Sequence, residues 1–218
     1  MIFTVKEICR RARANNIFTV IDGAHTPGQI QLNLEEIGAD FYGGNCHKWL
    51  CAPKGAGFLY AAPQVQSLVE PLIVSWGWQS ENPGPSQFID YLEWTGTQDL
   101  SAFLSVPEAI LYQQERNWNE IRKSCHNLAK QAILQISELT CLQPLYPATD
   151  TWFAQMGTAR LPDNIDITGL HDALWTQYQI EIPTINWNGT KLIRFSFQAY
   201  NSNSDIDRLL FALKNLLT

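Results

Sequence analysis

The residues best suited to chemistry in this sequence are an acid and a lysine that follow two separate apolar runs. Asp22 ends the β-rich run 17–21, which we expect to be a buried strand, and Lys48 lies in the glycine-rich turn 43–48. Charged groups in such places are costly to bury unless each has a partner. A single ligand lying between Asp22 and Lys48 would be a partner for both.

Pyridoxal phosphate (PLP) is a ligand with these two requirements. It needs a lysine amine to form a Schiff base, and an acid that faces its pyridine nitrogen and keeps that nitrogen protonated. At about 4 Å and an effective dielectric near 20, such an ion pair contributes roughly 4 kcal/mol. The sequence therefore indicates a PLP site in which Lys48 and Asp22 have these two roles.

The elements expected around Asp22 and Lys48 alternate between helix and strand. The pattern Thr4-Val5-Lys6-Glu7 resembles a capping box and predicts a first helix, and the strand 17–21 follows it. A short helix over 34–37 and a strand over 39–42 complete an αβαβ order, which predicts a parallel sheet. Ligands of such sheets bind beyond the carboxyl ends of the strands, where Asp22 and the lysine turn both lie.

The rest of the chain predicts a loop-rich region followed by helices and a small α+β part. The expected features are a strand over 57–60, loops over 62–98, helices starting at Ser105 and near Ile121, a strand over 151–161, a helix over 168–178, a turn over 186–189, a strand over 191–197 and a last helix capped by Ser204. The helix that begins near Ile121 keeps its apolar period to Leu139 and is expected to connect two domains.

Four linked motifs closely resemble the class V aminotransferase family of PLP enzymes, in its isopenicillin-N-epimerase-like branch. They are Asp22-Gly23-Ala24-His25, Gly38-Ala39-Asp40-Phe41-Tyr42, Gly44-Asn45-Cys46-His47-Lys48-Trp49 and Gly55-Ala56-Gly57-Phe58. Their order along the chain makes the resemblance more specific than any single glycine motif.

The resemblance implies an α/β fold: the C-terminal part of the PLP-dependent transferase large domain, a mostly parallel sheet with helices, plus a small α+β C-terminal domain. It divides the chain into a partial PLP-binding large domain (1–100), connecting helices (101–140) and the small domain (141–218). In the family, a preceding segment carries the main phosphate-binding loop and the residue that stacks on the cofactor. The chain thus looks like the C-terminal portion of a family member.

The resemblance also assigns roles to residues near the lysine turn. Lys48 would form the Schiff base and Asp22 would face the pyridine nitrogen, while His25 would lie near the phenolic oxygen of the cofactor. Asn45 and His47 would contact the phosphate, although His47 could instead only orient Lys48. Without the resemblance, His25 would be read as a histidine that shapes the following turn.

Two further residues are expected to bind ligands. Thr97, in Trp94-Thr95-Gly96-Thr97, would reach across a dimer interface to the partner's PLP phosphate; its alternative is a turn before a helix cap at Asp99 or Ser101. Arg194 would hold the substrate α-carboxylate with its guanidinium fork. The alternative for Arg194 is a salt bridge at a strand edge.

The reaction itself stays open among transamination, racemisation or epimerisation, and C–S elimination, because these reactions share Lys48, Asp22 and Arg194. A desulfurase with a nucleophilic cysteine shortly before the arginine is disfavoured, since no cysteine lies between Cys141 and Arg194. The alternatives to an enzyme are a truncated non-catalytic fragment and one half of a split enzyme that needs an N-terminal partner chain. A plain α/β binding domain would leave Asp22 and Lys48 without a purpose.

Composition limits which classes of partner and which cellular location we expect for this protein. A net charge of −6 without a basic stripe argues against nucleic-acid binding. The sequence contains no run of 18 apolar residues, so no membrane-spanning helix is predicted. The first residues make a poor signal peptide, and five cysteines without a CxxC pair indicate reduced thiols in the cytoplasm. Cys46, His47 and Cys51 match no standard zinc spacing, so no metal is expected. The resemblance, rather than the composition, implies an amino-acid substrate and either a homodimer or pairing with a missing N-terminal half.

Overall fold

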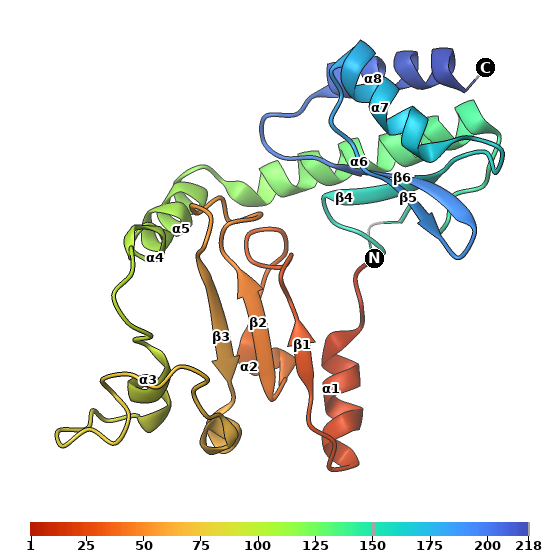
Figure 1. The fold of residues 1–218 in the computed structure, drawn as a ribbon. Helices are drawn as coiled ribbons and strands as arrows, with labels where there is room; N and C mark the ends of the chain where they lie inside the picture. Colours follow the sequence, from red (N-terminus) through yellow and green to blue (C-terminus); the bar gives the residue numbers. More distant parts are fainter. Residues whose placement is uncertain (150, 218) are drawn as a thin grey trace. The chain divides into compact units, whose positions relative to one another are not determined.

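The computed structural model describes residues 1–149 and 151–217, which form two compact units (Figure 1). One unit comprises Thr4–Gln114, and the other comprises Met1–Phe3 together with Glu115–Thr218. The division falls inside the segment 101–140 that was expected to connect two domains. The domain boundaries expected from the sequence stay predictions.

The first unit is built on a three-stranded sheet of order β1-β2-β3. The strands are β1 (Val20–Asp22), β2 (Phe41–Asn45) and β3 (Gly57–Ala61), and the helices are α1 (Val5–Ala14), α2 (Leu34–Ile37), η1 (Pro63–Leu68), α3 (Gln87–Leu92), α4 (Ser101–Leu104) and α5 (Val106–Glu115). β1 and β2 are parallel, as the αβαβ order predicts, whereas β2 and β3 are antiparallel. The α/β fold class is thus confirmed, with a mixed sheet in this unit.

Local sequence explains where the elements around β1 and β2 begin and end. The Asn33 side chain accepts a hydrogen bond from Glu36 N at the start of α2, and Gly38 ends α2 with φ 69°. The start of β1 is tied to the start of β2, because Asp40 Oδ2 accepts hydrogen bonds from Thr19 N at 2.8 Å and from Thr19 Oγ1 at 2.9 Å. This buried pair keeps the two parallel strands in register.

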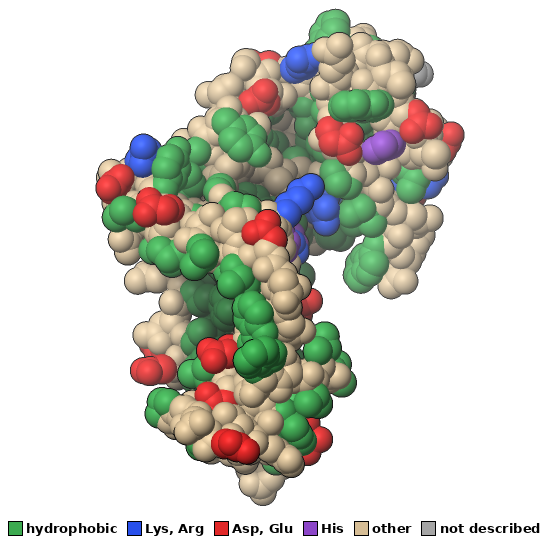
Figure 2. Space-filling view, turned by 60° about the vertical axis from the view of Figure 1, so that its left-hand side comes forward, with side chains coloured by type: hydrophobic (Ala, Val, Ile, Leu, Met, Phe, Trp, Pro, Cys, Tyr) green, Lys and Arg blue, Asp and Glu red, His purple; other side chains and the backbone are tan. Residues whose placement is uncertain are grey.

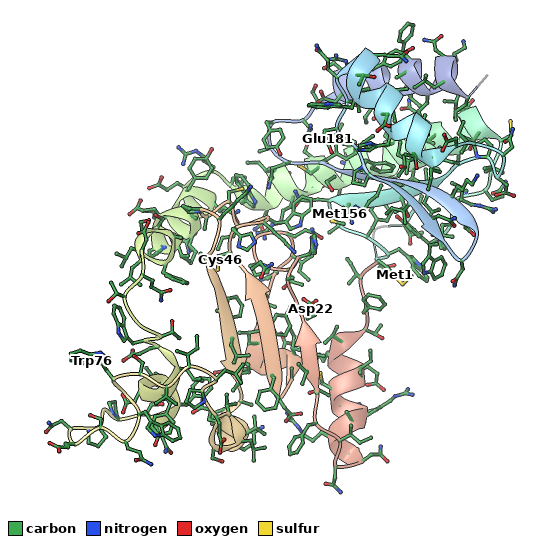
Figure 3. All side chains as sticks on the ribbon, viewed as in Figure 1. Met1, Asp22, Cys46, Trp76, Met156 and Glu181 are labelled. Carbon is green, nitrogen blue, oxygen red and sulfur yellow. The ribbon has the colours of Figure 1, made fainter. Side chains whose placement is uncertain are left out.

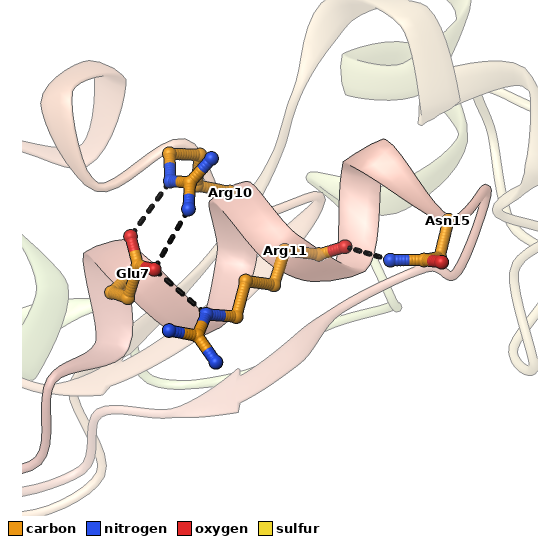
Figure 4. A network of polar contacts seen from close by, with 4 residues as sticks. All are labelled: Glu7, Arg10, Arg11 and Asn15. Atoms are coloured by element: carbon orange, nitrogen blue, oxygen red, sulfur yellow. Dashed lines mark hydrogen bonds and ion pairs between the residues drawn. The ribbon is translucent and has the colours of Figure 1, made fainter.

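The capping box expected at Thr4 is wrong, although helix α1 begins where it was predicted. The Thr4 side chain makes no capping hydrogen bond. Glu7 instead accepts hydrogen bonds from Arg10 and Arg11 on the next turn, at 2.7–2.8 Å (Figure 4). These two guanidinium groups lower the pKa of Glu7 to about 2.

The expectation that the first strand is buried is also wrong. β1 begins at Val20, which is 78% exposed, and no strand pairs with its outer edge among the described residues. Ile17 and Phe18 just before it are 60% and 64% exposed. Hydrophobic side chains also lie at many places on the face drawn in Figure 2. An edge strand with exposed apolar residues is normally covered by another element or chain.

The second unit contains a sheet of order β4-β6-β5 in which all pairs are antiparallel. Its elements are α6 (Trp118–Thr140), β4 (Met156–Arg160), α7 (Ile167–Tyr178), β5 (Thr184–Trp187), β6 (Thr190–Ser196) and α8 (Asn203–Leu216). One continuous core joins α6, α7 and α8 to the inward side chains of β4 and β6. This confirms the α+β character expected for the C-terminal part.

Two local expectations in this unit are wrong. Asn186 and Trp187 belong to β5 rather than to a turn, because the tight turn is confined to Asn188 and Gly189, whose φ values are 48° and 79°. The last helix is capped by Ser202 and not by Ser204. The capping box between Ser202 and Asp205 explains the earlier start, since each side chain bonds the other's backbone N–H.

Candidate active site

The predicted acid and lysine follow neighbouring strands in the first unit. Asp22 at the end of β1 is in register with Gly43 of β2, and Gly23 N donates a hydrogen bond to Gly43 O at 2.9 Å. Asp22 and Cys46, two residues before Lys48, lie at the same end of the sheet (Figure 3). The parallel pairing therefore brings the loop after β1 and the turn after β2 together, as the strand-end argument predicts.

The loop after β1 packs directly on the lysine turn. Gly28 has φ +82°, and a Cβ there would lie 2.5 Å from the Trp49 carbonyl and from Leu50 N. The loop and the turn are also joined by a hydrogen bond that Trp49 Nε1 donates to His25 Nδ1 at 3.1 Å. The neutral His25 ring therefore carries its proton on Nε2. Glycine at 28 and tryptophan at 49 together hold His25 next to the lysine turn.

A second hydrogen bond joins the loop after β1 to strand β2, between Thr26 and Tyr42. Thr26 Oγ1 donates to Gly23 O at 2.7 Å, so the Tyr42 hydroxyl, 2.6 Å from Thr26 Oγ1, is the donor in that pair. Burial raises the pKa of Tyr42, with a smaller upward contribution from the Asp22 charge and an opposing one from Thr26. A Cβ at Gly23 would lie 2.1 Å from the Tyr42 ring. The residue after Asp22 must therefore be glycine for this ring to fit.

The Asp22 carboxylate is held by the backbone but is exposed to solvent. Its Oδ1 accepts a hydrogen bond from Ala24 N at 3.0 Å, and no other hydrogen bond of this side chain is found in residues 1–149 and 151–217. No atom lies within 4 Å of the position that a Cβ on the facing Gly43 would occupy. Asp22 thus has an uncommitted oxygen and open space beside it.

Lys48 is half-buried, and its ammonium group has no hydrogen bond or ion pair within the described part of the chain. Hydrogen bonds within the first unit hold the turn that carries Lys48. Cys46 N donates to Ala56 O and Ala52 N to Cys46 O, both at 3.0 Å, and Gln113 Nε2 of α5 donates to Trp49 O at 2.9 Å. These hydrogen bonds hold the backbone around Lys48, while its ammonium group has no partner in the part of the chain that the structure describes.

Asn45 and His47 precede this lysine, and different contacts hold them in place. Asn45 is the last residue of β2 and pairs with Gly57 of β3. His47 Nδ1 lies 2.9 Å from Ala56 O, and because a carbonyl only accepts, Nδ1 carries a proton. In the neutral ring, Nε2 is then an acceptor. His47 can donate to an anion through Nε2 only when it is protonated to imidazolium.

Three other residues considered from the sequence make no described contact with Lys48 or Asp22. Thr97 is exposed in the loop between α3 and α4, with Gly96 at φ +117°. Asp99 Oδ1 accepts a hydrogen bond from Ser101 N at 2.9 Å, as expected of a residue that precedes a helix. Lys54 is exposed in a turn. The described contacts do not join Thr97 to Lys48 or Asp22.

Arg194 belongs to the second unit, where it lies in the central strand β6. It is half-buried, its Nε is buried without a hydrogen-bond partner, and no acid pairs with it among the described residues. The alternative of a strand-edge salt bridge is therefore wrong for this part of the chain. Arg194 also lines a cavity of about 380 Å³ within its unit.

Several residues that shape the lysine turn were missed from the sequence. Trp49 was quoted only as part of a motif, and Gln113 was not considered. Gln113 could have been found as a polar residue on the apolar stripe of its helix, since it follows Val106 and Ala109 at intervals of seven and four and is 7% exposed. Tyr42 and Thr26 gave no comparable signal, because their pairing depends on the loop conformation.

Neither a metal centre nor a membrane span is found in the residues described. No group of three or more His, Cys, Asp or Glu side chains there could hold a metal ion. No described helix is long and apolar enough to cross a membrane. Cys46 and Cys51 are not in disulfide bonds within the described residues, and burial raises the pKa of both thiols.

Comparisons with known proteins identify the family of this chain. A family described as "Aminotransferase class-V" matches residues 1–209. The isopenicillin N epimerase of Amycolatopsis lactamdurans is 34% identical over 225 residues, which cover 99% of this chain and 56% of that protein. The chain thus spans about half the length of the curated relatives that it matches.

Solved structures confirm the fold. A cysteine desulfurase from Thermococcus onnurineus superimposes with a TM-score of 0.81 at 20% identity, covering 98% of this chain and 56% of that chain. A variant of C-DES with glycine covalently linked to its PLP cofactor also gives a TM-score of 0.81, at 19% identity, covering 99% of this chain and 57% of its own. Both resemble the chain over almost its whole length.

Proposed function

This chain belongs to the class V aminotransferase family, and from that premise we propose that it takes part in a PLP-dependent reaction on an amino acid. The reaction would be of the aminotransferase, epimerase or C–S lyase type. The observation that carries the proposal is the placement of Asp22 and Lys48 after adjacent parallel strands, each with an uncommitted charged group.

The residues present suit PLP in their donor chemistry. The cofactor requires an amine, an acid for its ring nitrogen and hydrogen-bond donors for its phosphate. Lys48 supplies an amine without a protein partner, Asp22 a carboxylate with a free oxygen, and Asn45 an amide beside the lysine. The open space at Gly43 lies next to the acid. On this donor set we assign the cofactor to the strand ends of the first unit.

Each residue of the proposed site has a separate task. Lys48 would hold the cofactor covalently and move a proton at the substrate Cα, and Asp22 would stabilise a proton on the ring nitrogen. His25, oriented by Trp49, would face the phenolic oxygen with its Nε2 proton. Asn45 would donate to the phosphate, and His47 would do so as imidazolium. When bound, PLP supplies an electron sink for the bond broken at Cα.

Two further contacts belong to the same proposal. Arg194 would hold the α-carboxylate of the amino acid with its unpaired guanidinium. Thr97 would donate its exposed hydroxyl to the phosphate bound by the partner in a homodimer. The reducing environment expected for the five cysteines makes a cytoplasmic location part of the proposal.

An absorbance titration with PLP tests this function. The chain is expected to develop a visible band that survives desalting, and Lys48→Ala is expected to abolish it. Lys54→Ala is the matched control, because Lys54 is a nearby exposed lysine outside the proposed site. A stable band that persists in Lys48→Ala, or disappears in Lys54→Ala, would refute the assignment of Lys48.

A second candidate function is favoured by the exposure of β1. Asp22 is exposed, and in a water-like dielectric an ion pair at about 4 Å contributes only about 1 kcal/mol, against roughly 4 kcal/mol in a partly dry site. Val20 of β1 and Phe18, two residues before it, are both exposed. We infer as the alternative that the chain works with a partner polypeptide that covers β1, and that it is inactive by itself.

Mixing experiments separate the two candidates. The probe is the part of the Amycolatopsis lactamdurans epimerase that this chain does not match, produced as a separate polypeptide. If the alternative holds, the PLP band forms only in the mixture, and the two chains co-elute in size-exclusion chromatography. A stable band in the chain alone would contradict the alternative. A band in neither sample would contradict both candidates.

A further inference from the structure

The face of the second sheet that points away from the helices carries two arginines. A Cβ at Gly157 of β4 would lie 2.4 Å from the Phe195 ring and 3.2 Å from Ile133 of α6, so positions 157 and 195 face the helices. Because side chains alternate along a strand, Arg160 and Arg194 face the opposite side. The register pairs Thr158 with Arg194 and Arg160 with Leu192.

This register makes Arg160 and Arg194 diagonal neighbours. Diagonal pairs in an antiparallel sheet have their Cβ atoms about 7 Å apart, within reach of long side chains. The residues that lie between them on this face, Thr158 and Leu192, are uncharged. Two like charges therefore lie next to each other without an acid in between.

Neither guanidinium is compensated by the described part of the protein. Both side chains are half-buried, and the Nε atoms of both are buried without a hydrogen-bond partner. No hydrogen bond or ion pair of either side chain is found in residues 1–149 and 151–217. Partial burial of unpaired charges carries a desolvation cost, so a pair of them on one face is best explained by a ligand with matching negative charges.

We propose that Arg160 and Arg194 form a two-arginine site for a ligand with two carboxylates. The proposal rests on the proposed function for Arg194, which holds the α-carboxylate, and adds that the amino-acid substrate carries a second acidic group that Arg160 holds. Each guanidinium binds one carboxylate bidentately, which lysine cannot do. Arg160 is thus a specificity residue for acidic substrates.

The cavity that Arg194 also lines is a poorer place for the second carboxylate. Glu181, Asp205 and Arg208 line that cavity of about 380 Å³ together with Arg194, and Arg208 donates a hydrogen bond to Tyr178 O. The two acids offset the charge of Arg208 and repel a second carboxylate, whereas no acid pairs with Arg160 in the residues described. The charge distribution therefore directs the second acidic group along the sheet toward Arg160.

Calorimetric titration of the full chain tests the site without relying on PLP or turnover. The probes are glutarate, a dicarboxylate, and butyrate, a monocarboxylate of similar carbon chain. We expect glutarate to bind about tenfold more tightly than butyrate, consistent with one additional charge-assisted bidentate contact. Arg194→Gln is expected to weaken both ligands.

Variants at position 160 supply the decisive comparison. Arg160→Gln is expected to lower glutarate affinity about tenfold and leave butyrate unchanged, and Arg160→Lys to restore part of the loss because it keeps the charge without the fork. Lys214→Gln, at an exposed position on α8, controls for net charge. Circular dichroism checks that each variant is folded.

Two results would overturn the proposal. One is equal affinity of the unmodified chain for glutarate and butyrate, or no measurable binding of glutarate. The other is an unchanged glutarate-to-butyrate ratio in a folded Arg160→Gln variant. Either result leaves the PLP titration of the first unit unaffected, so failure of the two-arginine site is distinguishable from failure of the proposed function.

Discussion

The two sheets of this protein differ in how completely the chain covers them. In the second unit, α6, α7 and α8 join β4 and β6 in one continuous core that includes Leu174 and Ile193, both 0% exposed. In the first unit, the described buried residues fall into separate clusters, and Val20 at the edge of the sheet is 78% exposed. The proposed cofactor residues lie on the less covered sheet.

The two units therefore differ in what they contribute: the second has the larger apolar core, and the first carries the proposed cofactor residues. The second unit has the apolar burial expected of a self-sufficient domain, while the sheet face away from its helices carries two arginines that have no partner among the described residues. The first unit holds its lysine turn through specific hydrogen bonds and close glycine contacts, and its described buried residues form several small clusters. The proposed chemistry therefore depends on local geometry in one unit and on an uncompensated charge pair in the other.

Removing core volume from the second unit is expected to have the largest effect on stability. Leu174→Ala, at a fully buried position of α7, should lower the free energy of unfolding by about 2–5 kcal/mol. Leu59→Ala is the control in the first sheet, where Leu59 is 51% exposed, and should change it by less than about 1 kcal/mol. Urea denaturation followed by far-UV circular dichroism measures both. Equal losses would contradict the difference in burial between these two positions.

A methyl group at position 28 is expected to act on the site more than on the fold. Gly28→Ala forces a residue with φ +82° against the Trp49 carbonyl, at a cost of roughly 1–3 kcal/mol. The loop should move away from the lysine turn, so the affinity for PLP is expected to fall. Gly55→Ala is the matched control, since Gly55 also has positive φ but has no atom near its Cβ position. Similar PLP titrations for both variants would show that the contact between the loop and the turn is not needed.

Changing the exposed edge of the first sheet should leave the isolated chain almost unaffected. Val20→Ser is expected to alter the free energy of unfolding by no more than about 0.5 kcal/mol, because Val20 is already exposed. If a partner polypeptide covers β1, the same change should weaken its binding in size-exclusion or pull-down assays. Leu68→Ser, at an exposed position of η1, controls for loss of an apolar group elsewhere. Unchanged partner binding in Val20→Ser would remove β1 from the interface.

The smallest expected effect concerns pH and helix α1. The pKa of Glu7 is lowered from 4.5 to about 2 by its hydrogen bonds to Arg10 and Arg11. A carboxyl whose folded pKa is depressed contributes stability above its unfolded pKa and loses it as pH falls through the folded value. Thermal unfolding between pH 5 and pH 2 should therefore show a slightly smaller acid loss in Glu7→Gln than in the unmodified chain. Identical acid profiles would show that this ion pair contributes nothing measurable.

Much of the site arrangement could be predicted from the sequence, because it follows from strand order. The motifs around Asp22 and Lys48 and the αβαβ alternation predicted two parallel strands with both residues after their carboxyl ends, and β1 pairs with β2 in this way. The bounds of α2 were also predicted, since Asn33 and Gly38 are strong start and stop signals.

Other features depend on tertiary contacts that leave no local pattern. The exposure of β1 could not be read from Ile17 to Ile21, because an apolar strand has the same sequence whether or not another element covers it. The Trp49–His25 hydrogen bond depends on the path of a loop. Strand β5 was not predicted, because the polar residues beside the short turn at Asn188 and Gly189 resemble a longer loop.

The assignment of the cofactor to Lys48 is the central claim, and chemical trapping tests it most directly. The chain is incubated with PLP, treated with borohydride to fix the cofactor to the lysine that holds it, and mapped by peptide mass spectrometry. We expect the label on Lys48, with Lys54 and the other lysines essentially unmodified. A label spread over exposed lysines, or concentrated on Lys54, would contradict it.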